Sequence, residues 1–104
     1  MNEAQKKAVE KLRVLAEEQC PDGYTIERFH TDHVTSEFCN FVSVSVWFKK
    51  KFALKTSQFF IGPNGGITYP MHRRKDGSQY ERRFNGDIME TVRAQRRDDK
   101  ARGF

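Results

Sequence analysis

Apolar side chains recur at intervals of three and four residues near the start of the chain, as on one face of a helix. The stripe consists of Ala4, Ala8, Val9, Leu12, Leu15 and Ala16. Asn2 precedes it and Gln5 follows three residues later, which is the spacing of a capping box. Pro21 and Gly23 end the pattern. These features predict an amphipathic helix within residues 1–20 whose stripe faces the core.

Alternation with a period of two replaces the helical pattern further along the chain. Residues 24–30 predict a strand, residues 31–36 a loop, and residues 37–48, "EFCNFVSVSVWF", the strongest strand. The apolar even positions of that strand are Phe38, Val42, Val44, Val46 and Phe48. Its second face also carries Cys39, Phe41 and Trp47. That face could therefore pack against a helix or await a partner.

Two dipeptides that tolerate positive φ, Asn64-Gly65 and Asp76-Gly77, predict tight hairpin turns. They divide the chain into strands at residues 52–61, 67–74 and 79–84. Before them, the run Lys49-Lys50-Lys51 either turns or continues as a bent strand, and both alternatives stay open. The stretch "GPNGG" is a turn rather than a phosphate-binding loop, because no Gly-Lys-Ser/Thr follows and no helix begins there.

Asn85 is positioned to cap a final helix, with Asp87 and Glu90 where the helix dipole favours negative charge. Ile88 and Val92 mark its buried side. Beyond Val92 the segment is polar all round, so the basic tail is expected to fray. The fold class is α+β: an antiparallel meander sheet of three to five strands, with both helices packed on one face. One domain spans residues 1–104, comprising a helix to residue 20, a sheet over 24–84, and a helix with its tail over 85–104.

Charge is divided unevenly along the 104 residues, whose formal net charge is +5. Residues 1–48 hold five Lys/Arg and eight Asp/Glu, a balance of −3, whereas residues 49–104 hold fourteen and six, a balance of +8. This asymmetry favours a polyanion, or an acidic protein surface, as the partner of the second half. A basic protein kept soluble by its charge is the alternative.

A turn centred on Asp76-Gly77 would place Arg73 opposite Tyr80, His72 opposite Glu81 and Met71 opposite Arg82. The hairpin would then be apolar at its base and cationic at its tip, which suits phosphate contacts and stacking on bases. An exposed hairpin kept soluble by arginine is the alternative. The lysine run could equally guard a sheet edge, and the arginines of the last helix could simply favour its dipole. The candidate nucleic-acid contacts are Lys49, Lys50, Lys51, Arg73, Arg74, Lys75, Tyr80, Arg82, Arg83, Arg96 and Arg97.

Metal and catalytic chemistry find little support in the residue spacing. His30, His33 and Cys39 lack the tight paired spacing of structural zinc sites, so no metal or other cofactor is expected. No nucleophile–base constellation appears, and no catalytic residue is assigned. Cys20 and Cys39 are expected to be reduced thiols. The polar start lacks a secretory signal and no apolar run of transmembrane length occurs, so a cytoplasmic protein without a membrane partner is expected.

Two functional hypotheses follow. The first is a small, basic, non-catalytic domain that binds DNA or RNA through its C-terminal half. The second is a protein-interaction module or inhibitor, of the kind that phages and mobile elements encode, which docks on an acidic surface of a host protein. Phe41 and Trp47 would form that interface. A monomer and a homodimer are both compatible with the sequence.

Overall fold

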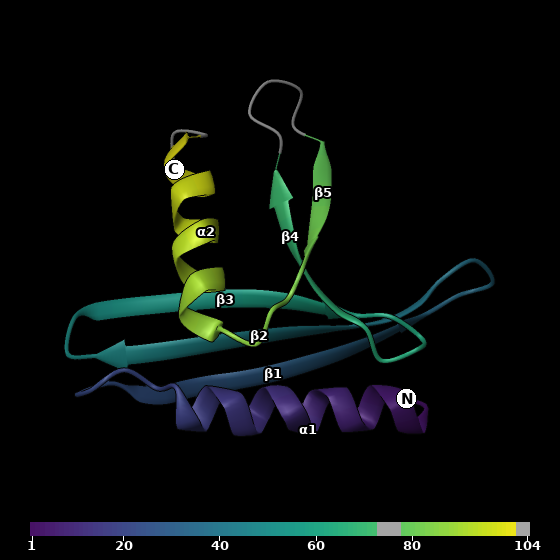
Figure 1. Ribbon diagram of the computed structural model, residues 1–104, viewed down its shortest axis with the longest axis horizontal. Coiled ribbons are helices and arrows are strands. Elements are labelled where there is room, and N and C mark those ends of the chain that lie inside the picture. Colours follow the sequence, from purple (N-terminus) through teal and green to yellow (C-terminus); the bar gives the residue numbers. More distant parts are fainter. Residues whose placement is uncertain (73–77, 102–104) are drawn as a thin grey trace.

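The chain folds into a helix, an antiparallel five-stranded meander and a second helix. The computed structural model describes residues 1–72 and 78–101. Its elements are α1 (Glu3–Glu18), β1 (Thr25–Thr35), β2 (Asn40–Lys50), β3 (Ala53–Ile61), β4 (Ile67–His72), β5 (Gln79–Arg83) and α2 (Ile88–Ala101). The strands follow one another in the order β1-β2-β3-β4-β5 (Figure 1). The predicted α+β meander is therefore confirmed, with the largest of the expected strand numbers. Arg73, Arg74, Lys75 and the predicted Asp76-Gly77 turn lie outside the described residues.

Helix α1 packs its apolar stripe against the long strands. Ala8, Leu12 and Ala16 are buried in one cluster with the even positions of β2, which are completely buried from Val42 to Phe48. The capping box forms as predicted. The Asn2 side chain accepts a hydrogen bond from the Gln5 amide at 2.8 Å, and the Gln5 side chain accepts one from the Asn2 amide at 3.1 Å.

The loop predicted at residues 31–36 is wrong, because β1 continues to Thr35. Residues from Thr31 to Thr35 pair with β2, ending at Thr35 opposite Asn40. This part of β1 is polar and largely exposed, so it shows no alternation from which a strand could be predicted. Phe38 lies in the connection beyond the strand and is 91% exposed, so its predicted place in the core is also wrong.

Strands β3 and β4 separate soon after the turn that joins them. They pair only at Phe60–Thr68 and Ile61–Ile67, after which β4 and β5 rise away from the long strands with α2 beside them (Figure 1). Gln95 of α2 accepts a hydrogen bond from the Gln58 amide at 3.0 Å and donates one to the Gln58 carbonyl at 2.9 Å. Helix side chains thereby satisfy backbone groups that a neighbouring strand would otherwise satisfy.

The predicted fraying of the C-terminal tail is wrong, since α2 extends to Ala101. Ala94 and Asp98 are buried, and Asp98 accepts a hydrogen bond from the His72 amide at 2.9 Å. These contacts anchor a polar segment that has no apolar stripe. The predicted cap is displaced as well. Asp87 accepts from the Glu90 amide at 3.1 Å, which makes Asp87 the capping residue, whereas Asn85 accepts from the Asp87 amide at 3.0 Å.

The lysine run resolves into a turn, and the next turn differs from its prediction. Strand β2 ends at Lys50 and β3 begins at Ala53, with Lys51 in the left-handed region at φ 50°. In the following turn the Gly65 amide donates to the Gly62 carbonyl at 3.0 Å. Its central residues are therefore Pro63 and Asn64, not Asn64-Gly65. The fixed φ of proline favours the first central position of such a turn.

The β4–β5 register differs by two residues from the predicted one. Met71 lies opposite Tyr80, and His72 lies opposite Gln79, rather than opposite Arg82 and Glu81. Because side chains alternate with a period of two, a shift of two residues keeps each side chain on its predicted face. The predicted pairing of His72 with Glu81 is wrong, and Glu81 instead accepts from the Thr68 hydroxyl at 3.1 Å.

Candidate nucleic-acid interface

The turn between β2 and β3 gathers lysines on both faces of a two-stranded ribbon. Lys49 and Lys50 are consecutive strand residues, so they point to opposite faces. The Lys49 ammonium lies 3.4 Å from the Glu27 carboxylate. On the other face, the ammonium groups of Lys50 and Lys55 lie 5.8 and 5.6 Å from the centre of the Tyr24 ring. One aromatic ring thus brings together cations from both strands.

Arg96 of α2 extends this group of cations. It lines a hollow of about 270 Å³ between α2 and β3, and Lys55 lines the same hollow. Lys55 therefore connects the lysine run with an arginine more than forty positions later in the sequence. We define the turn cluster as Lys49, Lys50, Lys51, Lys55 and Arg96. Glu27 and Asp99 are acids that lie beside it, so positive charge predominates.

Lys55 and Tyr24 are members of this region that sequence reasoning missed. A signal for Lys55 existed: once the chain turns at Lys51, the next strand runs back beside β2 and carries Lys55 opposite Phe48. The sequence left that turn undecided, so the lysine on the returning strand could not be placed. Tyr24 belongs to a segment distant in sequence, and no local pattern indicates its contact with the turn.

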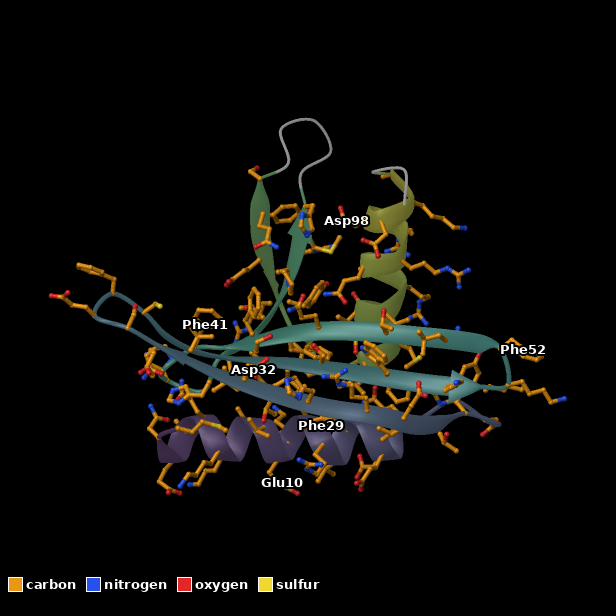
Figure 2. All side chains as sticks on the ribbon, turned by 180° about the vertical axis from the view of Figure 1, so that it is seen from behind. Glu10, Phe29, Asp32, Phe41, Phe52 and Asp98 are labelled. Carbon is orange, nitrogen blue, oxygen red and sulfur yellow. The ribbon has the colours of Figure 1, made fainter. Side chains whose placement is uncertain are left out.

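Two exposed apolar side chains lie at the end of the ribbon, in and just after the turn. Phe52 follows Lys51 in the turn and is fully exposed, at 105% of its reference area. Leu54 is 50% exposed and lines the hollow shared by Lys55 and Arg96. Figure 2 shows Phe52 at the extremity of the long strands, pointing away from the remainder of the molecule.

The sheet face opposite α1 continues from this turn, and we call it the open face. The alternation of side chains distinguishes the two faces: Phe29 lies opposite the buried Val46 and has Arg13 of α1 4.3 Å from its ring, whereas Phe41 is an odd position of β2. On the open face the Phe41 and Phe60 rings meet edge to face at 5.4 Å. The Arg28 guanidinium lies 5.2 Å from the Trp47 ring. Its members on β2 and β3 are Phe41, Ser43, Ser45, Trp47, Thr56, Gln58 and Phe60, all exposed or half-buried.

The open face is hollowed at two places. At one end, Phe41 and Phe60 line a hollow of about 520 Å³ together with Arg83 of β5. At the other end, a hollow of about 340 Å³ lies beside Trp47 and reaches Asp98 of α2. The first is bordered by aromatic rings and the second by hydroxyl, amide and carboxylate groups. Aromatic rings therefore stand at both ends of a polar surface.

The predicted basic contacts do not form one surface. Lys49, Lys50, Lys51 and Arg96 belong to the turn cluster, whereas Arg82 and Arg83 lie on opposite faces of β5. Arg83 borders the Phe41 hollow, and Arg82 shares the face of Tyr69, Met71 and Tyr80. Arg97 is exposed on α2.

The histidines and cysteines considered as metal ligands make other contacts. His30 lies 3.0 Å from the Asp32 carboxylate, and His33 lies 2.8 Å from the Asn40 side-chain oxygen. In the described ranges, no three His, Cys, Asp or Glu side chains come together as a metal site. Both cysteines are free, and burial raises the pKa of the Cys20 thiol. No helix within residues 1–72 or 78–101 is long and apolar enough to cross a membrane.

Comparison with known proteins gives no relative: no family model, curated protein or solved structure matches the chain. Two features of the described residues bear on its function, the turn cluster and the adjoining open face.

Proposed function

We propose that the chain is a non-catalytic nucleic-acid-binding domain whose phosphate contacts lie in the turn cluster. The observation that carries the proposal is that Lys50 of β2 and Lys55 of β3 lie beside the Tyr24 ring, while Arg96 of α2 lines a hollow together with Lys55. Contacts between phosphate and Lys or Arg supply most of the affinity in sequence-independent binding. A cluster built by three elements holds its charges near one another, which a run of lysines in a loop would not do.

The open face supplies the surface for bases. Trp47 lies two residues before Lys49 on the same face of β2, so a strand bound at the turn reaches its ring directly. From Trp47 to Phe41 the strand spans roughly 20 Å, with Phe60 beside Phe41 at the far end. Bases of any sequence stack on aromatic rings of this kind. We therefore propose a single-stranded segment, DNA or RNA, lying along β2.

Fluorescence anisotropy with labelled single-stranded DNA and RNA tests this function. The double variant Lys55→Ala/Arg96→Ala removes two positive charges from the turn cluster. The matched control, Lys7→Ala/Lys11→Ala, removes two charges from the exposed surface of α1. We expect the first variant to weaken binding at least tenfold more than the control at ~100 mM salt. Absence of binding by the unmodified protein at ~50 mM salt, or equal losses in both variants, would contradict the proposal.

A second candidate function is a protein-interaction module, which the hollow beside Phe41 favours. Its Phe41, Phe60 and Ile67 walls would accept an apolar side chain of a partner, with Glu81 and Arg83 at the border. Trp47 distinguishes the two functions because it is the single tryptophan of the chain. Stacking of bases would change its emission on titration with oligonucleotide. An unchanged emission, together with absent binding, would leave the protein partner as the better explanation.

A further inference from the structure

The turn that carries Phe52 is built from residues that oppose its local stability. Lys51 occupies the left-handed region at φ 50°, where a side chain is disfavoured and glycine or asparagine is usual. Phe52 next to it is completely exposed to water. A residue pair such as Asn-Gly would form a tight turn at lower cost. Residues that disfavour their own local conformation are expected at functional sites, so this turn is a candidate binding site.

The surroundings of Phe52 define the chemistry of that partner. Lys49 lies on the open face of the ribbon, whereas Lys50 and Lys55 lie on the face of Tyr24. An exposed ring therefore stands at the end of the ribbon with cations on both sides. A ligand that complements this end of the ribbon would present a flat apolar surface bordered on two sides by negative charge. The end of a base-paired helix has this form, since its last base pair is flanked by two phosphate backbones.

We propose that Phe52 stacks on the terminal base pair where a duplex meets a single strand. Lys49 and Lys50, on opposite faces, contact the two backbones of the duplex. One strand continues over the open face, where Trp47 is the first ring it meets after Lys49. Aromatic side chains stack on the faces of bases irrespective of sequence. The inference rests on the proposed function and adds to it the structural class of the nucleic acid, a junction between double and single strand.

The chain provides a matched control at the opposite end of the long strands. Phe38, in the connection between β1 and β2, is 91% exposed, like Phe52. Its neighbours in sequence are Glu37 and Cys39 rather than lysines. Replacing Phe38 or Phe52 by alanine therefore removes an exposed ring of the same kind from two different electrostatic environments.

The experiment compares three labelled DNA probes: a single strand, a blunt duplex, and a hairpin duplex that carries the same single strand as a tail. We expect the tailed hairpin to bind at least about fivefold more tightly than the single strand, the lower end of one stacking contact. Phe52→Ala should reduce this ratio to about one while keeping the affinity for the single strand. Phe52→Trp should restore the ratio, and Phe38→Ala should leave it unchanged. A 2-aminopurine at the terminal pair should change its emission with the unmodified protein but not with Phe52→Ala.

The outcomes separate this inference from the proposed function. Binding to the single strand without any preference for the junction would overturn the inference and leave the function in place. If the protein bound none of the three probes, both the inference and the proposed function would be overturned. Vesicles containing phosphatidylserine provide the remaining arm, because an anionic bilayer also offers an apolar layer beneath negative charge. If Phe52→Ala abolished sedimentation with such vesicles and left the junction ratio unchanged, the turn would be a membrane contact and the inference would be wrong.

Discussion

The Gln95 side chain forms hydrogen bonds that a neighbouring strand would otherwise form with the backbone of β3. It bonds to both backbone groups of Gln58 in β3 and donates to the Pro70 carbonyl of β4 at 3.2 Å. Gln95→Ala would leave these groups without that partner. We expect a loss of about 1–3 kcal/mol in the free energy of unfolding, measured in urea. Arg97→Ala, at an exposed position of the same helix, should change that free energy by less than about 0.5 kcal/mol. Equal effects would mean that the bridge does not stabilise the fold.

The two thiols should differ in reactivity. Burial raises the pKa of the Cys20 thiol, so less of it is thiolate at a given pH, and its Sγ also donates to the Tyr24 carbonyl at 3.3 Å. Cys39 is exposed. Because the thiolate is the reactive form, Cys39 should react several times faster with a disulfide reagent at pH ~8. Cys20→Ser and Cys39→Ser variants assign the two phases, and a faster Cys20 would contradict the prediction.

At the scale of elements, the β3–β4 turn is fitted against the start of α1. Gly65 has φ 84°, and a Cβ there would lie 3.0 Å from the Ala4 carbonyl oxygen. The Asn2 side chain donates to the Pro63 carbonyl at 2.9 Å. Gly65→Ala should therefore lower the free energy of unfolding by about 1–2 kcal/mol from the left-handed conformation alone. Gly66→Ala is the control, since its Cβ would meet nothing within 4 Å, and thermal unfolding measures both.

Elements with an apolar period were predictable, and elements held by polar contacts were not. The alternation of β2 and the stripe of α1 identify their buried faces correctly. The second half of β1 and the tail of α2 lack such a period. Their structure depends on pairing with β2 and on Gln95 and Asp98, which are contacts between distant segments. The turn residues located the β3–β4 hairpin to within one residue, whereas the β4–β5 register depends on pairing along the strands.

In the candidate site, too, the charged residues could be predicted from the sequence, whereas the contacts between distant segments could not. The lysine run and Arg96 could be selected from composition, because charge is visible in the sequence. Their connection through Lys55 and Tyr24 required the returning strand and a segment some twenty-five residues earlier than the run. Phe52 could not be singled out, since its exposure depends on where the chain turns. Arg73, Arg74 and Lys75 remain a prediction, because they lie outside the described residues.

At the scale of the whole molecule, the position of charge matters more than its sum. Several cations of α1 have acidic neighbours on the same helix: Lys6 lies 3.7 Å from Glu3, and Arg13 lies 3.7 Å from Glu10. Arg93 of α2 likewise lies 3.9 Å from Asp87. The balance of +8 in the second half therefore does not describe one uniform surface. The turn cluster accounts for part of it, with five cations beside the acids Glu27 and Asp99.

This distribution predicts how single charges affect the salt dependence of binding. Removing a cation that contacts phosphate lowers the slope of log affinity against log salt by roughly 0.7 for a single strand and 0.9 for a duplex. Lys51→Ala should show such a decrease, because Lys51 lies in the turn beside Phe52. Lys11→Ala, the same change of charge on α1, should leave the slope unaltered. Anisotropy titrations over ~50–300 mM salt measure both slopes. If the two variants lowered the slope equally, net charge rather than the turn cluster would govern binding. Both variants remove one positive charge, so only a local phosphate contact would make their slopes differ.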